Sequence, residues 1–578
     1  MLRIAVRLFK ILVWGSLLAL LIACSAQPTE DVEDILDQLP ITDPGDSDPT
    51  PTPTPLPPDV FADSIEFNNA ANFTFDANAV SITTAASLVA IDQLDDDNSA
   101  GGFLNGSYSD TEYSSSQLQL DATGLTNGTG FYESRVIDAA GDVAWTNFAP
   151  VPVAPYGKTL PGNASAETQY ASDNFDMTGN VMLYRLDDQS GATVADYSGQ
   201  GQNLTVGGTV GTASGVISSG AVFVGGNTND VLLVNPVTNF PTTAATAAVW
   251  VKANVGSTGD GIYSYAVSGQ NNEFLLFNQS SLSFYTDGGN VNFGENIADG
   301  QWHHVVLTWD SATGAADLYI DGVHSGTRTI AAGHSLGAGG GFALGQEQDS
   351  VGGGYDSGQA FQGEIDEFAM FNRVLSVGEI QALYRRGSQR VKYQVRSCNT
   401  VNCTTENFVG PDGTNATYFS ELNNGSNNLP SFGLTLANNR FFQYRVEIES
   451  DDNTLNPQVT SVNIGPSHVN AGSPSVISVN SISYDNLGTF SASYGTGHNG
   501  SVSFQLSTDG ATWYYFDGAS WVIAADDSQN NSEAQVNSNI TSFGVAQGPG
   551  EVYVKAILNS SLGVQTVNLE SITITGTR

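Results

Sequence analysis

Short segments with strand periodicity, separated by turn residues, constrain the fold of this chain more than any other feature. In Phe441–Ile448 and Val502–Leu506 apolar side chains fall at every second position, as in a strand with one buried face. Dipeptides such as Asp509-Gly510 separate such segments and favour tight hairpins. Only the segment after Ser376 has the apolar spacing and N-terminal cap of a helix. The sequence therefore predicts an all-β protein.

Length and charge narrow the possible organisation and partners. The 578 residues allow about three domains, each with its own core. Acidic residues number 59 and basic residues 18, which gives a formal net charge of −41. Such a chain repels nucleic acid and anionic membrane surfaces, so we expect neither as a partner. The charge suits an exported protein that meets divalent cations.

The first 24 residues have the features of an export signal. A basic start precedes the apolar run Ile11–Ala23, which is short for a membrane span. The run ends in Leu21-Ile22-Ala23-Cys24, which resembles a bacterial lipobox. This resemblance implies a lipoprotein signal peptide over 1–24, lipidation of Cys24 and, with Ser25 next, an address at the outer membrane or cell surface. The alternative is an uncleaved membrane anchor.

The rest of the chain divides by composition. Residues 25–60 form an acidic and then Pro-Thr-rich linker, expected to be an extended polyproline stalk. Strand patterns that begin near residue 61 stop near Lys158 before a complete sandwich is formed, and similar patterns resume at Val391. We expect one discontinuous β-sandwich from 61–170 and 387–466, since a domain can be inserted at an exposed loop. The alternative is two separate small domains.

Two further assignments complete the organisation. Residues 171–386 are the expected inserted domain, and 467–578 a C-terminal β-sandwich rich in hairpin turns. Cys398 and Cys403 have four residues between them, and in an oxidising compartment a disulfide that closes a small hairpin is their simplest fate.

The loop Gly345–Gln359 is the strongest candidate site. It gathers three carboxylates and two amides on a glycine-rich backbone: Glu347, Asp349, Asp356, Gln348 and Gln359. Calcium takes six to eight oxygen ligands in flexible geometry, which such a loop can supply. The alternative is a solvated acidic loop, because Asp and Gly are also ordinary turn residues.

Several stretches of the inserted domain resemble one family. They are Tyr184–Asn203, Gln301–Trp309, Asp317–Val323 and Gly363–Leu375, and together they are similar to the laminin G-like and pentraxin branch of the concanavalin A-like jelly rolls. The resemblance implies a jelly roll over 171–386 and a calcium-dependent, lectin-like binding function.

Within that branch the loop looks most like pentraxins, which bind two adjacent calcium ions there. The resemblance implies that Glu347, Asp349, Asp356 and Gln359 are ligands, that Gln348 binds through its backbone carbonyl, and that a distant turn contributes Asn271 and Asn272. Pentraxins usually carry Asp where Asn271 stands, and the lost charge should weaken calcium binding. Phe277 and Thr286 resemble the apolar wall that lies beside phosphocholine in the pentraxin ligand site. The acidic residue that would face the choline group there has no clear counterpart in this sequence.

Glycosidases share this jelly roll, so the acidic residues of the strand around Glu364 are candidates for catalysis. Strand alternation places Glu364, Asp366 and Phe368 on one face, so Phe occupies the place of the second acid that retaining hydrolysis needs. We therefore expect no enzyme. The expected partner is a glycan or a phosphorylated surface polymer. The alternative is a structural adhesin or envelope scaffold in which calcium only rigidifies the loop; the oligomeric state is not predicted.

Overall fold

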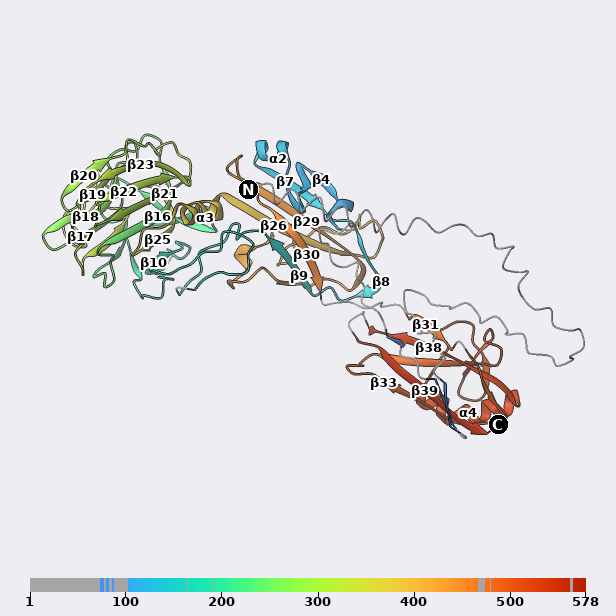
Figure 1. The fold of residues 1–578 in the computed structure, drawn as a ribbon. Helices are drawn as coiled ribbons and strands as arrows, with labels where there is room; N and C mark the ends of the chain where they lie inside the picture. The colour runs from blue at the N-terminus through green and yellow to red at the C-terminus, as the bar shows by residue number, and fades with distance from the viewer. Residues whose placement is uncertain are drawn as a thin grey trace, which may run out of the picture. The chain divides into compact units, whose positions relative to one another are not determined.

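The computed structural model describes residues 73–76, 79–82, 86–87, 102–163, 165–189, 191–465, 473–478, 480–561 and 565–577 (Figure 1). The signal peptide over 1–24, Cys24 and the linker over 25–60 lie outside the described residues. Strands dominate the described part, which confirms the all-β class. A search of these residues for a helix long and apolar enough to span a membrane found none.

Two eight-stranded sheets face each other in the jelly roll. One has the order β13-β14-β25-β16-β21-β22-β23, with β10 paired to β25, and the other the order β11-β12-β15-β24-β17-β18-β19-β20. Their strands are β10 (Asn180–Tyr184), β11 (Thr193–Val194), β12 (Leu204–Gly207), β13 (Gly211–Ser214), β14 (Ser219–Val224), β15 (Val231–Val234), β16 (Ala244–Ala253), β17 (Gly261–Val267), β18 (Gln270–Phe277), β19 (Ser283–Thr286), β20 (Gly289–Asn292), β21 (His303–Asp310), β22 (Ala315–Ile320), β23 (Val323–Thr329), β24 (Gly341–Leu344) and β25 (Gln362–Phe371).

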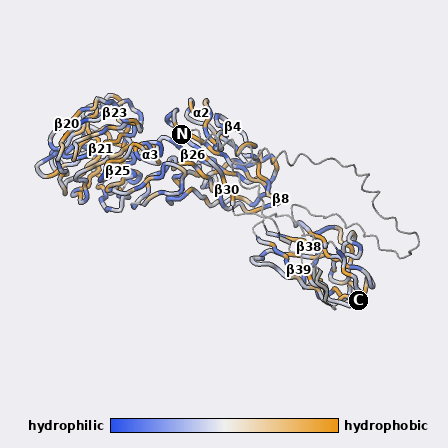
Figure 2. The backbone as a smooth tube through the Cα atoms, viewed as in Figure 1, coloured by the Kyte–Doolittle hydropathy of each residue, from blue (hydrophilic) through white to orange (hydrophobic). Residues whose placement is uncertain are grey.

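Large apolar side chains between the two sheets form the core of the jelly roll. Tyr263 and Phe342 from one sheet and Trp309 and Phe368 from the other are fully buried in a single cluster. Figure 2 shows hydrophobic and hydrophilic residues mixed along this domain. Strands β16 and β25 are buried along nearly their whole length, since the core covers one of their faces and other residues cover the second. This core supports the loops at the edges of both sheets.

Helix α3 (Val377–Ser388) closes the jelly roll where the sequence predicts a helix. The Ser376 side chain accepts from the backbone N–H of Glu379, and the Glu379 side chain accepts from the backbone N–H of Ser376, which is a capping box. Ile380 and Leu383 pack on the outer side of the first sheet. The cap and the apolar spacing together explain why this helix was predictable.

Strands on both sides of the jelly roll in sequence pair with each other. One sheet has the order β27-β26-β29-β7-β4, with β8 paired to β29, and the other the order β28-β9-β30-β6-β5. The elements are η3 (Phe103–Asn105), β4 (Ser107–Ser109), β5 (Thr111–Ser114), β6 (Gln117–Leu120), α2 (Ala122–Asn127), β7 (Thr129–Glu133), β8 (Ile137–Val143), β9 (Asn147–Pro152), β26 (Gln389–Cys398), β27 (Phe419–Ser420), η4 (Glu421–Asn423), β28 (Phe432–Gly433), β29 (Asn439–Ser450) and β30 (Val459–Gly465). The pairing of β7 with β29 and of β9 with β30 supports the discontinuous sandwich, which stays a proposal.

The C-terminal part differs from expectation at its N-terminal boundary and in a second long helix, α4, which was not predicted from the sequence. Its elements are β31 (Ser475–Ile477), β32 (Ile482–Tyr484), β33 (Asn486–Tyr494), β34 (Ser501–Ser507), β35 (Trp513–Phe516), β36 (Trp521–Ile523), β37 (Asn531–Ser532), α4 (Glu533–Gln547), β38 (Gly550–Asn559) and β39 (Asn568–Thr577). Strands β1 (Phe73–Asp76), β2 (Ala79–Ile82) and β3 (Ala86–Ser87) join this part: β2 and β3 pair with β39, whose other edge pairs with β33. The expected 61–170 segment of the discontinuous sandwich therefore starts too early, because β39 leaves an edge that these strands cover.

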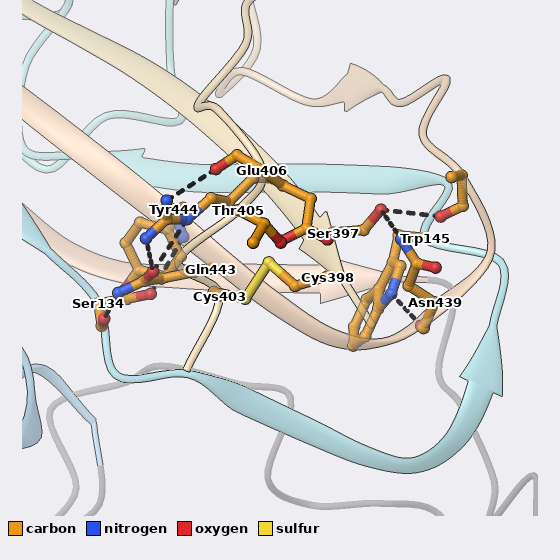
Figure 3. Close-up of a disulfide and its surroundings, with 12 residues drawn as sticks. Ser134, Trp145, Ser397, Cys398, Cys403, Thr405, Glu406, Asn439, Gln443 and Tyr444 are labelled. Carbon is orange, nitrogen blue, oxygen red and sulfur yellow. Dashed lines mark hydrogen bonds between the residues drawn. A yellow bond between two sulfur atoms is a disulfide. The ribbon is translucent and has the colours of Figure 1, made fainter. Parts of the chain in front are cut away.

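Cys398 and Cys403 form the predicted disulfide at the end of β26 (Figure 3). Their Cα atoms are 5.2 Å apart, and both side chains are fully buried. Nearby, the Trp145 indole N–H donates to the backbone oxygen of Asn439 at 2.8 Å, which ties the segment between β8 and β9 to β29. The disulfide thus closes a small loop beside a hydrogen-bonded aromatic side chain.

Candidate functional site

The loop Gly345–Gln359 connects β24 to β25 and folds over the outer face of β17. The Gly345 N–H donates to the Ile262 oxygen at 3.0 Å, and the Ser264 hydroxyl donates to the Gln346 oxygen at 2.7 Å. At the loop's far end, the Gly261 N–H donates to the Gln359 oxygen at 2.9 Å. A Cβ at Gly261 would lie 2.7 Å from the Glu347 nitrogen, so this approach requires glycine. The first residues of the loop are therefore held against a rigid strand.

Gln348 fixes the middle of the loop through its side chain. This side chain has 0% exposure, and its amide nitrogen donates to the Ser264 oxygen, the Ser264 hydroxyl and the Gly341 oxygen, each at 3.0 Å. Its amide oxygen accepts from the Gly352 N–H at 2.7 Å. Because the side chain is occupied inside the protein, a cation could use only the backbone carbonyl of Gln348, as the resemblance implied.

Asn271 and Asn272 reach the loop from β18. The pairing of β17 with β18 shifts register between Tyr265 and Val267, and the extra residues on β18 include both asparagines. The Asn271 amide nitrogen donates to the Asp349 carboxylate at 3.1 Å across 78 positions of sequence. Among the described residues, the buried amide oxygen of Asn272 has no hydrogen-bond partner. The structure thus brings the distant turn and the acidic loop together.

The three carboxylates differ in environment. Glu347 is 4% exposed, and one of its carboxylate oxygens is buried without a hydrogen-bond partner in the described part of the protein. Burial, followed by the negative charges of Asp349 and Asp356, raises the pKa of Glu347 to about 7. Asp349 and Asp356 are exposed, and Asp356 accepts from the Gly358 N–H at 2.9 Å. Glu347 is the group that would gain most from a bound cation.

These oxygens fit calcium in kind. Calcium prefers carboxylate, amide and carbonyl oxygens, and a buried oxygen without a hydrogen bond costs free energy that a cation would offset. Within the described ranges, no group of three or more His, Cys, Asp or Glu side chains could hold a metal ion by itself. A calcium ion would therefore depend on Asn272 and the Gln348 carbonyl as well as on the carboxylates. The half-buried side chain of Gln359 lies at the end of the same loop.

The apolar wall differs from expectation at one residue. In the pairing of β18 with β19, Phe277 lies opposite Ser283 and Leu275 lies opposite Tyr285. Thr286 therefore shares the inward side with the core residue Phe284, and it has 0% exposure. Tyr285 instead lies beside the half-buried Phe277, with ring centroids 6.0 Å apart and an edge-to-face geometry. The register thus places Thr286 on the core side of β19, which contradicts the expectation that it lines an apolar wall on the surface. Strand alternation was the signal that could have placed Tyr285 on the outer side.

Asp366, the second acidic residue of β25, binds backbone N–H groups. It is fully buried, and its carboxylate accepts from the N–H groups of Val216, Ile217 and Glu367 at 2.8, 3.1 and 2.9 Å. Burial raises its pKa to about 8. Glu364 pairs with Lys252 at 3.1 Å. Both acids of β25 are therefore bound to neighbouring segments of the jelly roll.

Comparison with known proteins identifies relatives for one part of the chain. Residues 222–408 match the Pentaxin family model. The chain carries a pentraxin domain. Rat neuronal pentraxin-1 is 35% identical over 143 residues, which are 24% of this chain and 33% of that protein. Human pentraxin-4 is 35% identical over 171 residues, which are 28% of this chain and 35% of that protein.

The chain spans about a third of the length of these curated relatives. Among solved structures, a heptameric SAP-like pentraxin from Limulus polyphemus is similar, with 24% identity and a TM-score of 0.26. The match covers 33% of this chain and 91% of that one. The pentraxin domain, as matched, includes the acidic loop, the asparagine pair and helix α3.

Proposed function

We propose that this chain is a surface-anchored, calcium-dependent, lectin-like protein that binds a glycan or a phosphorylated polymer. The observation that carries the proposal is the contact between Asn271 and Asp349, 3.1 Å across two segments that lie far apart in sequence. Beside it lie buried oxygens of Asn272 and Glu347 without hydrogen-bond partners in the described residues. The anchor rests on Cys24, which lies outside the described residues.

Calcium would both hold the loop and bind the ligand. Glu347, Asp349 and Asp356 carry three negative charges at most, so two calcium ions would leave the cluster net positive. An anionic or hydroxyl-rich group could then complete the open coordination positions. Phe277 and Tyr285 would border this group on the same outer face. Glycans and phosphorylated polymers present such groups repeatedly.

A purely structural role for calcium is the second candidate. The 4% exposure of Glu347 favours it, because a buried ligand holds the loop without presenting the ion to solvent. Here the chain would be an adhesin or envelope scaffold with a calcium-stiffened loop. A glycoside hydrolase remains the least supported function, since Asp366 is committed to backbone N–H groups.

Two measurements on the full chain test these functions. Calorimetry should detect calcium binding that Asp349→Ala weakens at least about tenfold, the effect of roughly 1.4 kcal/mol of lost ligand interaction. Asp412→Ala, which removes an exposed carboxylate from another loop, should leave calcium binding unchanged. Unaltered calcium binding by Asp349→Ala would refute the site.

A glycan array with and without EDTA then separates the two roles. The lectin-like function predicts ligand retention that EDTA abolishes and that Asp349→Ala lowers in parallel. Calcium binding with no calcium-dependent retention of any glycan or phosphorylated polymer would support the structural role and reject the lectin-like one.

A further inference from the structure

A buried lysine lies beside a carboxyl group and an asparagine, all outside the residues that match the Pentaxin model. Lys158 follows β9, and Glu421 begins η4; both are 4% exposed. The Lys158 ammonium nitrogen lies 3.1 Å from one Glu421 oxygen, Oε2. The Asn424 amide nitrogen donates to the same oxygen at 3.0 Å. One carboxylate oxygen thus bridges an amine and a carboxamide.

The carboxamide of Asn424 is held in a polarising environment. Its oxygen, Oδ1, accepts from the Ser426 hydroxyl at 2.8 Å and from the Ser426 N–H at 3.3 Å. Its nitrogen also donates to the Asn428 oxygen at 2.7 Å. Two donors on a carbonyl oxygen stabilise negative charge that develops there when a nucleophile attacks the carbon. The loop around η4 therefore holds Asn424 as an electrophile.

We propose that Lys158 and Asn424 become joined by an intramolecular isopeptide bond, with Glu421 as the proton carrier. The neutral Lys158 nitrogen attacks Cγ of Asn424, and the C–N bond forms as the carbonyl oxygen takes negative charge beside Ser426. Glu421 removes a proton from the lysine nitrogen and delivers a proton to Nδ2. The bond from Cγ to Nδ2 breaks, and one ammonia molecule leaves. No oxidant or reductant is needed.

The surroundings favour this chemistry. Burial lowers the pKa of Lys158, which raises the fraction of neutral amine, and burial raises the pKa of Glu421, which suits a group that must accept and return a proton. Tyr170 donates to Glu421 at 3.1 Å and lies 2.7 Å from the Lys158 nitrogen. A cavity of about 190 Å³ borders Lys158, Glu421 and Asn424 and offers the ammonia an exit.

Peptide mass spectrometry of the purified full chain tests the bond. Trypsin should fail to cleave after Lys158, and a branched peptide should join Lys158 to Asn424 with the mass of one ammonia less than its two parts. Glu421→Gln keeps the side-chain shape but removes the proton carrier, so the branched peptide should be lost while near-UV circular dichroism stays native. Lys158→Arg should lose it as well.

The control variant is Asn427→Ala, since Asn427 lines the same cavity. It should keep the branched peptide at the level of the unaltered chain. Loss of ammonia alone is not decisive, because Asn424 precedes Gly425 and can form a cyclic imide. Complete cleavage after Lys158, with Asn424 recovered unlinked, would overturn the proposal and leave a buried ion pair only. A branched peptide that persists in Glu421→Gln would overturn the role of Glu421.

Discussion

Asn271 is the residue at which calcium affinity should be most easily changed. Its amide nitrogen donates to the Asp349 carboxylate at 3.1 Å. Asn271→Asp adds a ligand charge, so calcium affinity should rise on the order of tenfold, equivalent to ~1.4 kcal/mol. The same change places two carboxylates side by side, so the metal-free protein should become less stable. Calorimetry with calcium and thermal unfolding in EDTA measure the two effects.

Asn290→Asp is the matched control, because it adds the same charge at an exposed position of β20. It should change neither calcium affinity nor stability in EDTA. If Asn271→Asp weakens calcium binding, Asn271 does not face the ion, and the contact with Asp349 is only a hydrogen bond within the loop.

Asp260 should make the stability of the pentraxin domain depend on pH. It is 8% exposed, and burial raises its pKa to about 6. The ordinary pKa of Asp in an unfolded chain is about 3.9. The folded state thus binds the proton more tightly, so the stabilisation is complete below pH ~4 and is lost as pH rises through about 6. Asp260→Asn should therefore match the unaltered chain at pH 4 and exceed it by roughly 1–2 kcal/mol at pH 7.5, measured by denaturant unfolding in EDTA. If Asp260→Asn and the unaltered chain have equal free energies of unfolding at both pH 4 and pH 7.5, Asp260 is solvated in the folded protein.

At the scale of elements, the acidic loop shows what the sequence could predict. Oxygen-bearing residues on a glycine-rich segment indicated a cation site, and the resemblance added the distant asparagines, which the structure places beside the loop. Thr286 was misplaced because one residue of register exchanges the two faces of a strand. The full set of partners of Gln348 could not be predicted, since Ser264 and Gly341 come close only after β17 and β24 pair.

Gln348 should control the order of the whole loop. Gln348→Ala removes four hydrogen bonds and leaves buried partners on Ser264 and Gly341 unsatisfied. We expect a loss of roughly 2–4 kcal/mol in local stability. Hydrogen exchange over 345–359 should accelerate, and calcium affinity should fall because the carbonyl of residue 348 is no longer positioned.

Gln505→Ala provides the comparison. Gln505 is also buried, and its amide nitrogen donates to the oxygens of Asp526 and Gln529, so it holds a different loop. This variant should accelerate exchange around 525–530 and leave calcium binding intact. Slow exchange over 345–359 in Gln348→Ala would show that the loop is held by other contacts.

At the scale of the whole molecule, two sheet systems are assembled from distant segments. Strands β7 and β9 precede the pentraxin domain, and their partners β29 and β30 follow it. Strand β2 pairs with β39, which lies almost 500 residues later in the sequence. Alternation predicted strands in each segment, but it carries no information about partners. The boundary at residue 61 was therefore wrong, because the strand pattern of 73–87 does not reveal that these strands pair with β39. Helix α3 and the disulfide were predicted from local signals, whereas α4 was missed although Ser532 and Gln535 form the same kind of capping box.

Removal of β1 to β3 should weaken the C-terminal part selectively. A chain that starts at residue 102 lacks the strands that pair with β39, so that edge loses its hydrogen-bond partners and is open to pairing with other chains. In scanning calorimetry, we expect one transition to move to lower temperature, while the transition that calcium raises stays in place. A chain that starts at residue 61 keeps β1 to β3 and should show neither change. Light scattering should also detect self-association of the chain that starts at residue 102, because its exposed β39 edge can pair with other chains. If both truncated chains unfold alike, β39 does not depend on these strands, and residues 73–87 do not belong to the C-terminal sheet in solution.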